Sequence, residues 1–151
     1  MLKPAALIAG LAALPFAMFV TPVTAAEEAA VIGASEVIFG PADPAHPEAG
    51  EVAVLSGDPS KPGSFVARVR FKAGTVVRTH KHSKPEYVTV HSGKALMTFG
   101  EKSDKSKAVK LAAGSFLYLP GGQYHTLWIE EDAVAELFSV GPFDETFAET
   151  Q

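Results

Sequence analysis

Apolar and polar residues alternate through the middle of the chain with the period-2 pattern of β-strands. In residues 65–71, four apolar side chains share one face, while Val66, Arg68 and Arg70 share the other. Similar short stretches recur about every ten residues, with glycine or proline between them. We expect further strands at 52–55, 86–91, 95–99, 108–111, 116–119, 126–129 and 134–140. This spacing predicts an all-β fold, built as a small antiparallel β-barrel or a sandwich.

The first residues have the layout of a secretory signal peptide. Lys3 precedes an alanine-rich apolar run at 5–20, and small residues follow before an acidic pair. A retained membrane anchor is the alternative. The run is short for the roughly 20 residues that a bilayer span needs, and Pro15 interrupts it. We therefore expect cleavage near Ala25 or Ala26, and a mature protein that is periplasmic or secreted.

The rest of the chain is long enough for one domain with a core and too short for two. We expect a signal peptide at 1–26, an N-terminal arm and loop at 27–50, a β-barrel domain at 51–147 and a tail at 148–151. The acidic end, 144–151, is expected to be mobile. The alternative is that Phe143 and Phe147 dock it onto the barrel.

Composition narrows the choice of ligands and partners. The formal net charge is −4, and no basic stripe appears, so nucleic acid is not expected as a partner. The chain has no cysteine, so it can form no disulfide, and a metal would have to be held by nitrogen and oxygen atoms.

Two segments carry residues that suit a metal. His80 and His82 are two apart, so in a strand both side chains point to the same side, and Glu86 has the same parity. Glycines at 74 and 93 are expected to form the turns around this segment. A second segment, punctuated by Pro120 and its flanking glycines, supplies His125. We expect two adjacent hairpins to bring these four side chains to one centre.

Any one of these histidines, taken alone, is better explained as a surface residue or a hydrogen-bonded core residue. Four such groups inside one barrel are harder to explain without a ligand. An unpaired buried ion costs several kcal/mol, and a domain is stable by only about 5–15 kcal/mol. A bound cation removes this conflict. Three imidazoles and a carboxylate favour octahedral Mn or Fe, while Zn, Ni and Co remain alternatives.

These segments resemble the two signature motifs of the cupin superfamily. The first motif is matched in full by Gly74, His80, His82, Glu86 and Gly93. The second motif is matched by Gly114, Pro120, Gly122 and His125, but its final asparagine is Ile129 here. That asparagine is not a metal ligand in cupins, so the departure leaves the four-ligand set intact.

The resemblance covers most of residues 36–147 and extends to a group of small exported bacterial cupins. It implies a cupin-like jelly-roll barrel and, commonly, a homodimer. It also implies a metal-dependent dioxygenase, decarboxylase, isomerase or lyase, or a member that only binds ligands. Fold alone therefore leaves the function open.

Other polar and aromatic residues have two interpretations each. Arg68 and Arg70 would bind an anionic substrate if their face lined the barrel, but a solvent-exposed face is the preferred interpretation because two arginines are costly to bury. Three aromatic residues would line the pocket mouth: Tyr87, Tyr124 and Trp128. The parity of Tyr124 and Trp128 with His125 points these two away from the metal side, so packing or an oligomer interface is the preferred interpretation for them. His91 is expected at the surface, and His46 lies in a loop without an evident partner.

Two functions remain in view. One is an exported metal-dependent oxidoreductase, dioxygenase-like, that acts on a small molecule; no catalytic residue beyond the metal ligands stands out. The alternative is a non-catalytic module that binds or senses a metal or a small ligand. A partner protein acting at the cell envelope is a weaker third option. After removal of the signal peptide, no membrane contact is expected.

Overall fold

The computed structural model describes residues 29–44 and 50–149, so the expected signal peptide at 1–26 lies outside the described residues. All described elements belong to the compact unit Ile32–Gln151. These elements are the 3-10 turns η1 (Ala34–Glu36) and η3 (Lys105–Lys107) and the strands β1 (Gly40–Pro41), β2 (Glu51–Ser56), β3 (Gly63–Phe71), β4 (Val76–Lys81), β5 (Glu86–Phe99), β6 (Val109–Ala112), β7 (Phe116–Leu119), β8 (His125–Gly141) and β9 (Thr146–Phe147). No helix in this described part is long and apolar enough to span a membrane. The fold is all-β, as the sequence predicts.

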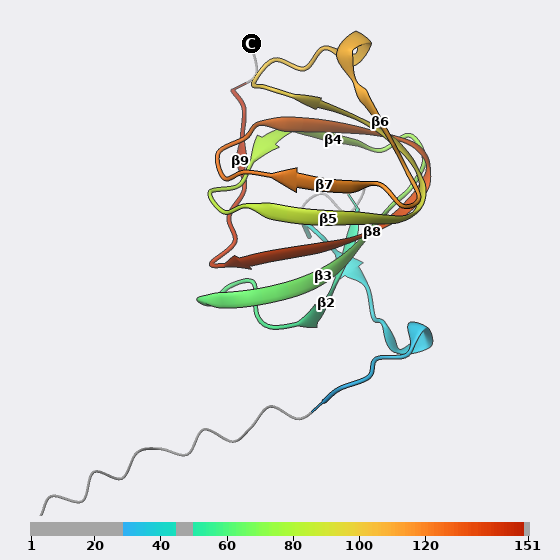
Figure 1. The fold of residues 1–151 in the computed structure, drawn as a ribbon, viewed down its shortest axis with the longest axis vertical. Coiled ribbons are helices and arrows are strands. Elements are labelled where there is room, and N and C mark those ends of the chain that lie inside the picture. Colours follow the sequence, from blue (N-terminus) through green and yellow to red (C-terminus); the bar gives the residue numbers. More distant parts are fainter. Residues whose placement is uncertain (1–28, 45–49, 150–151) are drawn as a thin grey trace, which may run out of the picture. The chain divides into compact units, whose positions relative to one another are not determined.

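Strand β8 organises the sheet. One half of this 17-residue strand pairs with β3 and the other half with β4, while β5 pairs along nearly all of it. All the strand pairs are antiparallel, and the main path runs β1-β2-β3-β8-β4-β9, with β6 and β7 joined to β5. Figure 1 shows β7, β5 and β8 side by side, with β3 and β2 beyond them. Because β8 bonds three neighbours over different lengths, the sheet curls into a half-open barrel.

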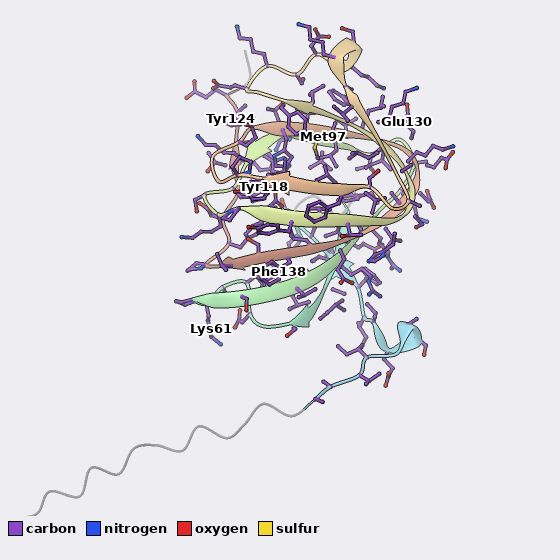
Figure 2. The ribbon with its side chains drawn as sticks, in the orientation of Figure 1. Lys61, Met97, Tyr118, Tyr124, Glu130 and Phe138 are labelled. Carbon is purple, nitrogen blue, oxygen red and sulfur yellow. The ribbon has the colours of Figure 1, made fainter. Side chains whose placement is uncertain are left out.

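The interior of the barrel is filled by the apolar face of each strand. Phe65 and Ala67 are buried on β3, whereas Arg68 and Arg70 point to the opposite face, which confirms the predicted alternation. The larger core cluster consists of Val90, Ala95, Met97, Leu111, Leu117, Leu119, Ile129 and Ala133. Met97 lies within the barrel in Figure 2, and Tyr118 and Phe138 lie on its outer face.

Two details of the predicted strand layout are wrong. Gly93 does not turn the chain; it lies at irregular pairing inside the single strand β5, with a φ of +83°. A Cβ there would collide with the carbonyl oxygen of Asp132, so glycine permits both the backbone conformation and the close approach of β8. The histidine segments also do not form hairpins. β4 pairs with β8 and β9, and β7 pairs with β5, because β8 and β5 are long enough to take several partners.

The C-terminal segment docks on the barrel through the residues considered for that role. β9 pairs with β4, placing Phe147 opposite His80, and the Ala148 amide donates to the Thr79 carbonyl. Phe143 packs against the smaller core cluster and meets the Phe65 ring edge-on at 5.2 Å. The described residues of the expected mobile end therefore lie against the strand that carries the histidines.

Candidate metal centre

Three strand ends bring the four predicted side chains together. His80 lies on β4, His82 follows the end of that strand, Glu86 begins β5 and His125 begins β8. His80 and His125 are direct Cα partners across β4 and β8. All four residues are buried, with exposed fractions between 3% and 8%. One end of the barrel thus encloses three imidazoles and one carboxylate, which is the set that the motif spacing predicts.

The three imidazoles are oriented by the backbone. Each Nδ1 lies against a carbonyl oxygen: that of Arg78 for His80 at 2.7 Å, that of Asp144 for His82 at 2.5 Å, and that of Gln123 for His125 at 3.1 Å. A carbonyl only accepts, so each Nδ1 must donate, and a neutral ring then keeps its lone pair on Nε2. This is the arrangement that fixes a metal-binding imidazole.

The free ring nitrogens converge. One ligand nitrogen from each histidine lies within 4.8 Å of the other two. Glu86 spans the same space, with Oε1 at 3.6 Å from His82 Nε2 and Oε2 at 3.7 Å from His125 Nε2. These separations are too long for hydrogen bonds. They are close to the roughly 3.0–3.5 Å between neighbouring donors around a metal whose bonds are about 2.1 Å long.

Burial sets the charges of the site. It lowers the pKa of His82 to about 4 and that of His125 to about 4, against the weaker opposing effects of their carbonyl partners. Both rings are therefore neutral at pH 7 and do not form ion pairs with Glu86. Burial, and then the nearby charge of Glu145, raises the pKa of Glu86 to about 7. Within residues 29–44 and 50–149, no lysine or arginine pairs with this carboxylate, and a divalent cation would supply the missing positive charge.

The donor set therefore fits a divalent metal. Three imidazole nitrogens and one carboxylate oxygen suit Mn, Fe, Co, Ni or Zn. With these four residues as ligands, a six-coordinate metal would keep two positions for water or substrate.

The C-terminal segment supports this site from outside. The sequence offered docking of Phe143 onto the barrel as an alternative, but it did not predict contact with the histidines. The Phe143 ring stacks on the His82 ring at 4.3 Å and 17°. The carboxylate of Asp144 accepts hydrogen bonds from the Ser83 amide at 2.8 Å and the Ser83 hydroxyl at 2.7 Å. Glu145 reaches to 3.6 Å from His80 Nε2. These contacts join residues about sixty positions apart, and the two phenylalanines and the acidity of the segment were their only signals in the sequence.

Two cavities meet at the histidines. The inner cavity, of about 120 Å³, is lined mostly by apolar core residues and reaches His80, Glu86 and His125. The outer cavity, of about 870 Å³, lies at the mouth of the barrel. Its lining includes His80, His82 and Glu86, together with Phe143 and Glu145. A small molecule that enters the mouth would therefore meet the histidine cluster before the apolar interior.

The arginines proposed for substrate binding are already paired with glutamates. Arg68 donates to Glu136 at 2.8 Å on the outer face of the sheet. Arg70 forms a two-point ion pair with Glu51, at 2.7 and 2.9 Å, and its guanidinium lies 4.1 Å from the centre of the Phe39 ring. Arg70 does line the outer cavity. A substrate role for either arginine stays a prediction, and it would require part of this pairing to be given up.

The remaining candidates lie away from the cluster. His91 is exposed, 3.5 Å from Glu136. Tyr124 carries the Lys81 amine above its ring, and Trp128 lines a separate outer pocket with Arg78. Ile129, which replaces the motif asparagine, is buried in the core. His46 lies outside the described residues.

The fold and the site together define a small antiparallel barrel with a histidine–carboxylate cluster at its open end. A family model for the Cupin domain matches residues 67–141, which include all four predicted ligands. The chain belongs to the cupin superfamily. A search of curated protein sequences gave no significant match.

Solved structures share this fold at low sequence identity. A conserved protein with a double-stranded β-helix domain from Klebsiella pneumoniae is 20% identical, with a TM-score of 0.61 over 82% of this chain and 100% of that one. KdgF from Halomonas sp. is 17% identical, with a TM-score of 0.58 over 76% and 96%. A salicylate 1,2-dioxygenase variant from Pseudoaminobacter salicylatoxidans, in complex with gentisate, is 17% identical, with a TM-score of 0.56 over 68% of this chain and 30% of that one. These matches show the fold and leave the reaction open.

Proposed function

We propose that this cupin holds one divalent transition metal through His80, His82, Glu86 and His125. The observation that carries the proposal is the set of three Nδ1–carbonyl hydrogen bonds, which leaves three ring nitrogens free to converge, two of them beside the buried Glu86 carboxylate. A barrel that needed these histidines only for packing would gain nothing from orienting all three lone pairs toward one centre.

Mn or Fe is the proposed metal. A shell of three nitrogens and one oxygen that leaves two positions open suits the octahedral preference of these ions, and Zn, Ni and Co are the alternatives. Affinity order alone would favour the later metals of the series. Supply in the compartment where the protein loads therefore decides between them.

We propose that the loaded site acts on a small oxygen-containing molecule, as a dioxygenase-like oxidoreductase. When bound, the metal would supply Lewis-acid or redox chemistry at its open positions. The chain contributes the oriented ligands, a mouth that admits a small molecule, and an apolar interior that limits water. A salicylate 1,2-dioxygenase shares the fold, so a barrel of this kind can host such a reaction.

A non-catalytic binding or sensing module is the second candidate. The small inner cavity supports it, because about 120 Å³ holds only a few water molecules, each of which takes about 30 Å³. A substrate of aromatic size would have to stay in the outer cavity. The two candidates share the metal site and differ in turnover.

The proposal includes export and a homodimer. Export is supported by the signal-peptide pattern at 1–26 and by the absence of cysteine, which an oxidising compartment tolerates. A dimer is supported by an exposed aromatic group on neighbouring strands of the outer face. Its members are Tyr87, Phe116, Tyr118 and Phe138. Light scattering on the purified protein tests the dimer, and N-terminal sequencing of the exported form tests the cleavage.

Metal analysis tests the central claim. We expect about one equivalent of Mn or Fe in protein prepared from its own compartment, and reconstitution of the apo-protein to the same level. Saturation at about 100 times the dissociation constant should stabilise the fold by about 2.7 kcal/mol. That corresponds to a rise in melting temperature of about 10 °C for a domain of this size. Failure to bind any divalent transition metal would refute the proposal. Oxygen uptake with small phenols, diketones and acids then separates the enzyme from the binding module.

A further inference from the structure

A second carboxylate, that of Glu145, lies at the open side of the histidine cluster. Its Oε1 is 3.6 Å from His80 Nε2. That nitrogen is the free one, because His80 Nδ1 is engaged with the Arg78 carbonyl. Glu86 lies at the same 3.6 Å from His82 Nε2. Glu145 therefore stands to His80 as Glu86 stands to His82, although it belongs to neither sequence motif.

The position of Glu145 is set by the backbone on both sides of it. On one side, Asp144 binds Ser83 through its carboxylate and His82 through its carbonyl. On the other side, β9 pairs with β4, and the Arg78 guanidinium lies 4.3 Å from the centre of the Phe147 ring. Because the residues on both sides of Glu145 are held in this way, the backbone position of Glu145 brings its side chain to the histidine cluster.

The two carboxylates differ in their contact with water. The side chain of Glu86 is 9% exposed, whereas that of Glu145 is 42% exposed and lines the outer cavity. If Glu86 left a metal it would remain buried and unsolvated, which is costly. If Glu145 left, it would swing into water and regain its hydration. Glu86 is thus suited to stay bound, and Glu145 is suited to exchange.

We infer that Glu145 is an exchangeable oxygen ligand of the metal. It closes the site while no substrate is bound, and an anionic, oxygen-containing substrate displaces it. This inference rests on the proposed metal site. Two carboxylates balance the charge of a divalent ion. Replacing Glu145 with an anion such as a carboxylate or an enolate preserves that balance, whereas a neutral substrate leaves a net positive charge in a largely apolar barrel. The exchange therefore selects for anions.

The experiment compares the full-length wild type with Glu145→Gln and with Glu149→Gln. The second variant makes the same charge change four residues later, at an exposed position outside the site. Each protein is loaded with Mn²⁺ for water-proton relaxation, which counts exchangeable waters on the metal, and with Co²⁺ for its absorption spectrum. Competition with a chelator gives the dissociation constant, and thermal melting checks the fold.

We expect Glu145→Gln to bind Mn²⁺ about tenfold more weakly and to gain one exchangeable water with an altered Co²⁺ spectrum. Acetate, used as the probe anion, should bind the loaded variant more tightly than the wild type because no carboxylate has to be displaced. Glu149→Gln should behave as the wild type. If Glu145→Gln does not fold, Glu145→Asp keeps the charge, shortens the reach and should give the same extra water.

The outcomes separate the two proposals. If the wild type binds no Mn²⁺ or Co²⁺, the metal site fails, and the role of Glu145 fails with it. If all three proteins bind the metals with the same affinity, water count and spectrum, the metal site stands and the role of Glu145 is overturned. Glu145 would then be only an acidic neighbour of His80.

Discussion

The outer face of the sheet and the mouth of the barrel differ in how their charged side chains are paired. On the outer face, Arg68 is paired with Glu136 and Arg70 with Glu51, so each charge is balanced by a protein side chain. In the mouth, Glu86 is buried beside the neutral imidazoles of His82 and His125, and no cationic side chain in the described part of the chain pairs with it. Charged side chains that are paired with one another contribute to the stability of the fold. A charge that it leaves unbalanced in a cavity indicates a ligand.

The largest difference in metal affinity between the two regions is expected from His125→Ala. Removing one of three nitrogen ligands should weaken metal binding by more than about 100-fold, since changes to the groups that merely orient ligands already cost about 10–100-fold. The dissociation constant is measured by chelator competition on the folded variant. Arg68→Ala, on the outer face, should leave it within about twofold. Equal losses of metal affinity in both variants would show that the mouth and the outer face do not differ in this way.

A smaller effect is expected from Asp144→Ala. This change removes the acceptor that ties Ser83 to the C-terminal segment, and thereby loosens the Asp144 carbonyl that orients His82. Metal affinity should fall about tenfold. Asp144→Asn keeps an oxygen acceptor at the same reach and is the matched control. If alanine and asparagine gave the same affinity as the wild type, the segment would be packed on the site without orienting it.

The smallest effect concerns the pH dependence of the outer face. The hydrogen bond from Arg68 lowers the pKa of Glu136 below its ordinary value of 4.5. The stability that this pair contributes is complete above pH 4.5 and is lost as the pH falls through the lowered value in the folded state. Because the pair is partly exposed, the contribution should stay below about 1 kcal/mol.

Urea unfolding of the metal-free protein between pH 2.5 and about 6 measures this contribution. Arg68→Gln should remove part of the loss of stability at low pH. Lys110→Gln, at an exposed position of β6, should not. An unchanged pH profile in Arg68→Gln would show that the pair contributes nothing measurable.

The alternation of apolar and polar residues and the motif spacing were enough to predict much of the barrel and the histidine–carboxylate cluster. The alternation of 65–71 predicted which face of β3 is buried, and the parity of Glu86 placed it on the inner face of β5. Such features depend on the two-residue period of a strand, which is visible in any single segment. The convergence of His125 with His80 followed from the second motif, and the structure places these two residues directly opposite each other.

The features that sequence reasoning missed depend on pairing between distant segments. Gly93 signalled a turn, but the length of β8 allows β5 to continue through it as one strand. The roles of Asp144 and Glu145 require β9 to lie on β4, and a two-residue strand has no pattern to reveal this. No local signal could therefore connect the acidic end of the chain to His82 and His80.

The carbonyl of Asp144 has a consequence for the order in which this protein matures. His80, His82 and Glu86 are synthesised some sixty residues before the peptide group that orients one of them. A nascent barrel that has not yet received its last short strand holds the ligands without the arrangement that makes them a binding site. If the site binds a metal as proposed, tight ion uptake would follow docking of the C-terminal segment, so loading would report that the chain has folded as far as its last short strand.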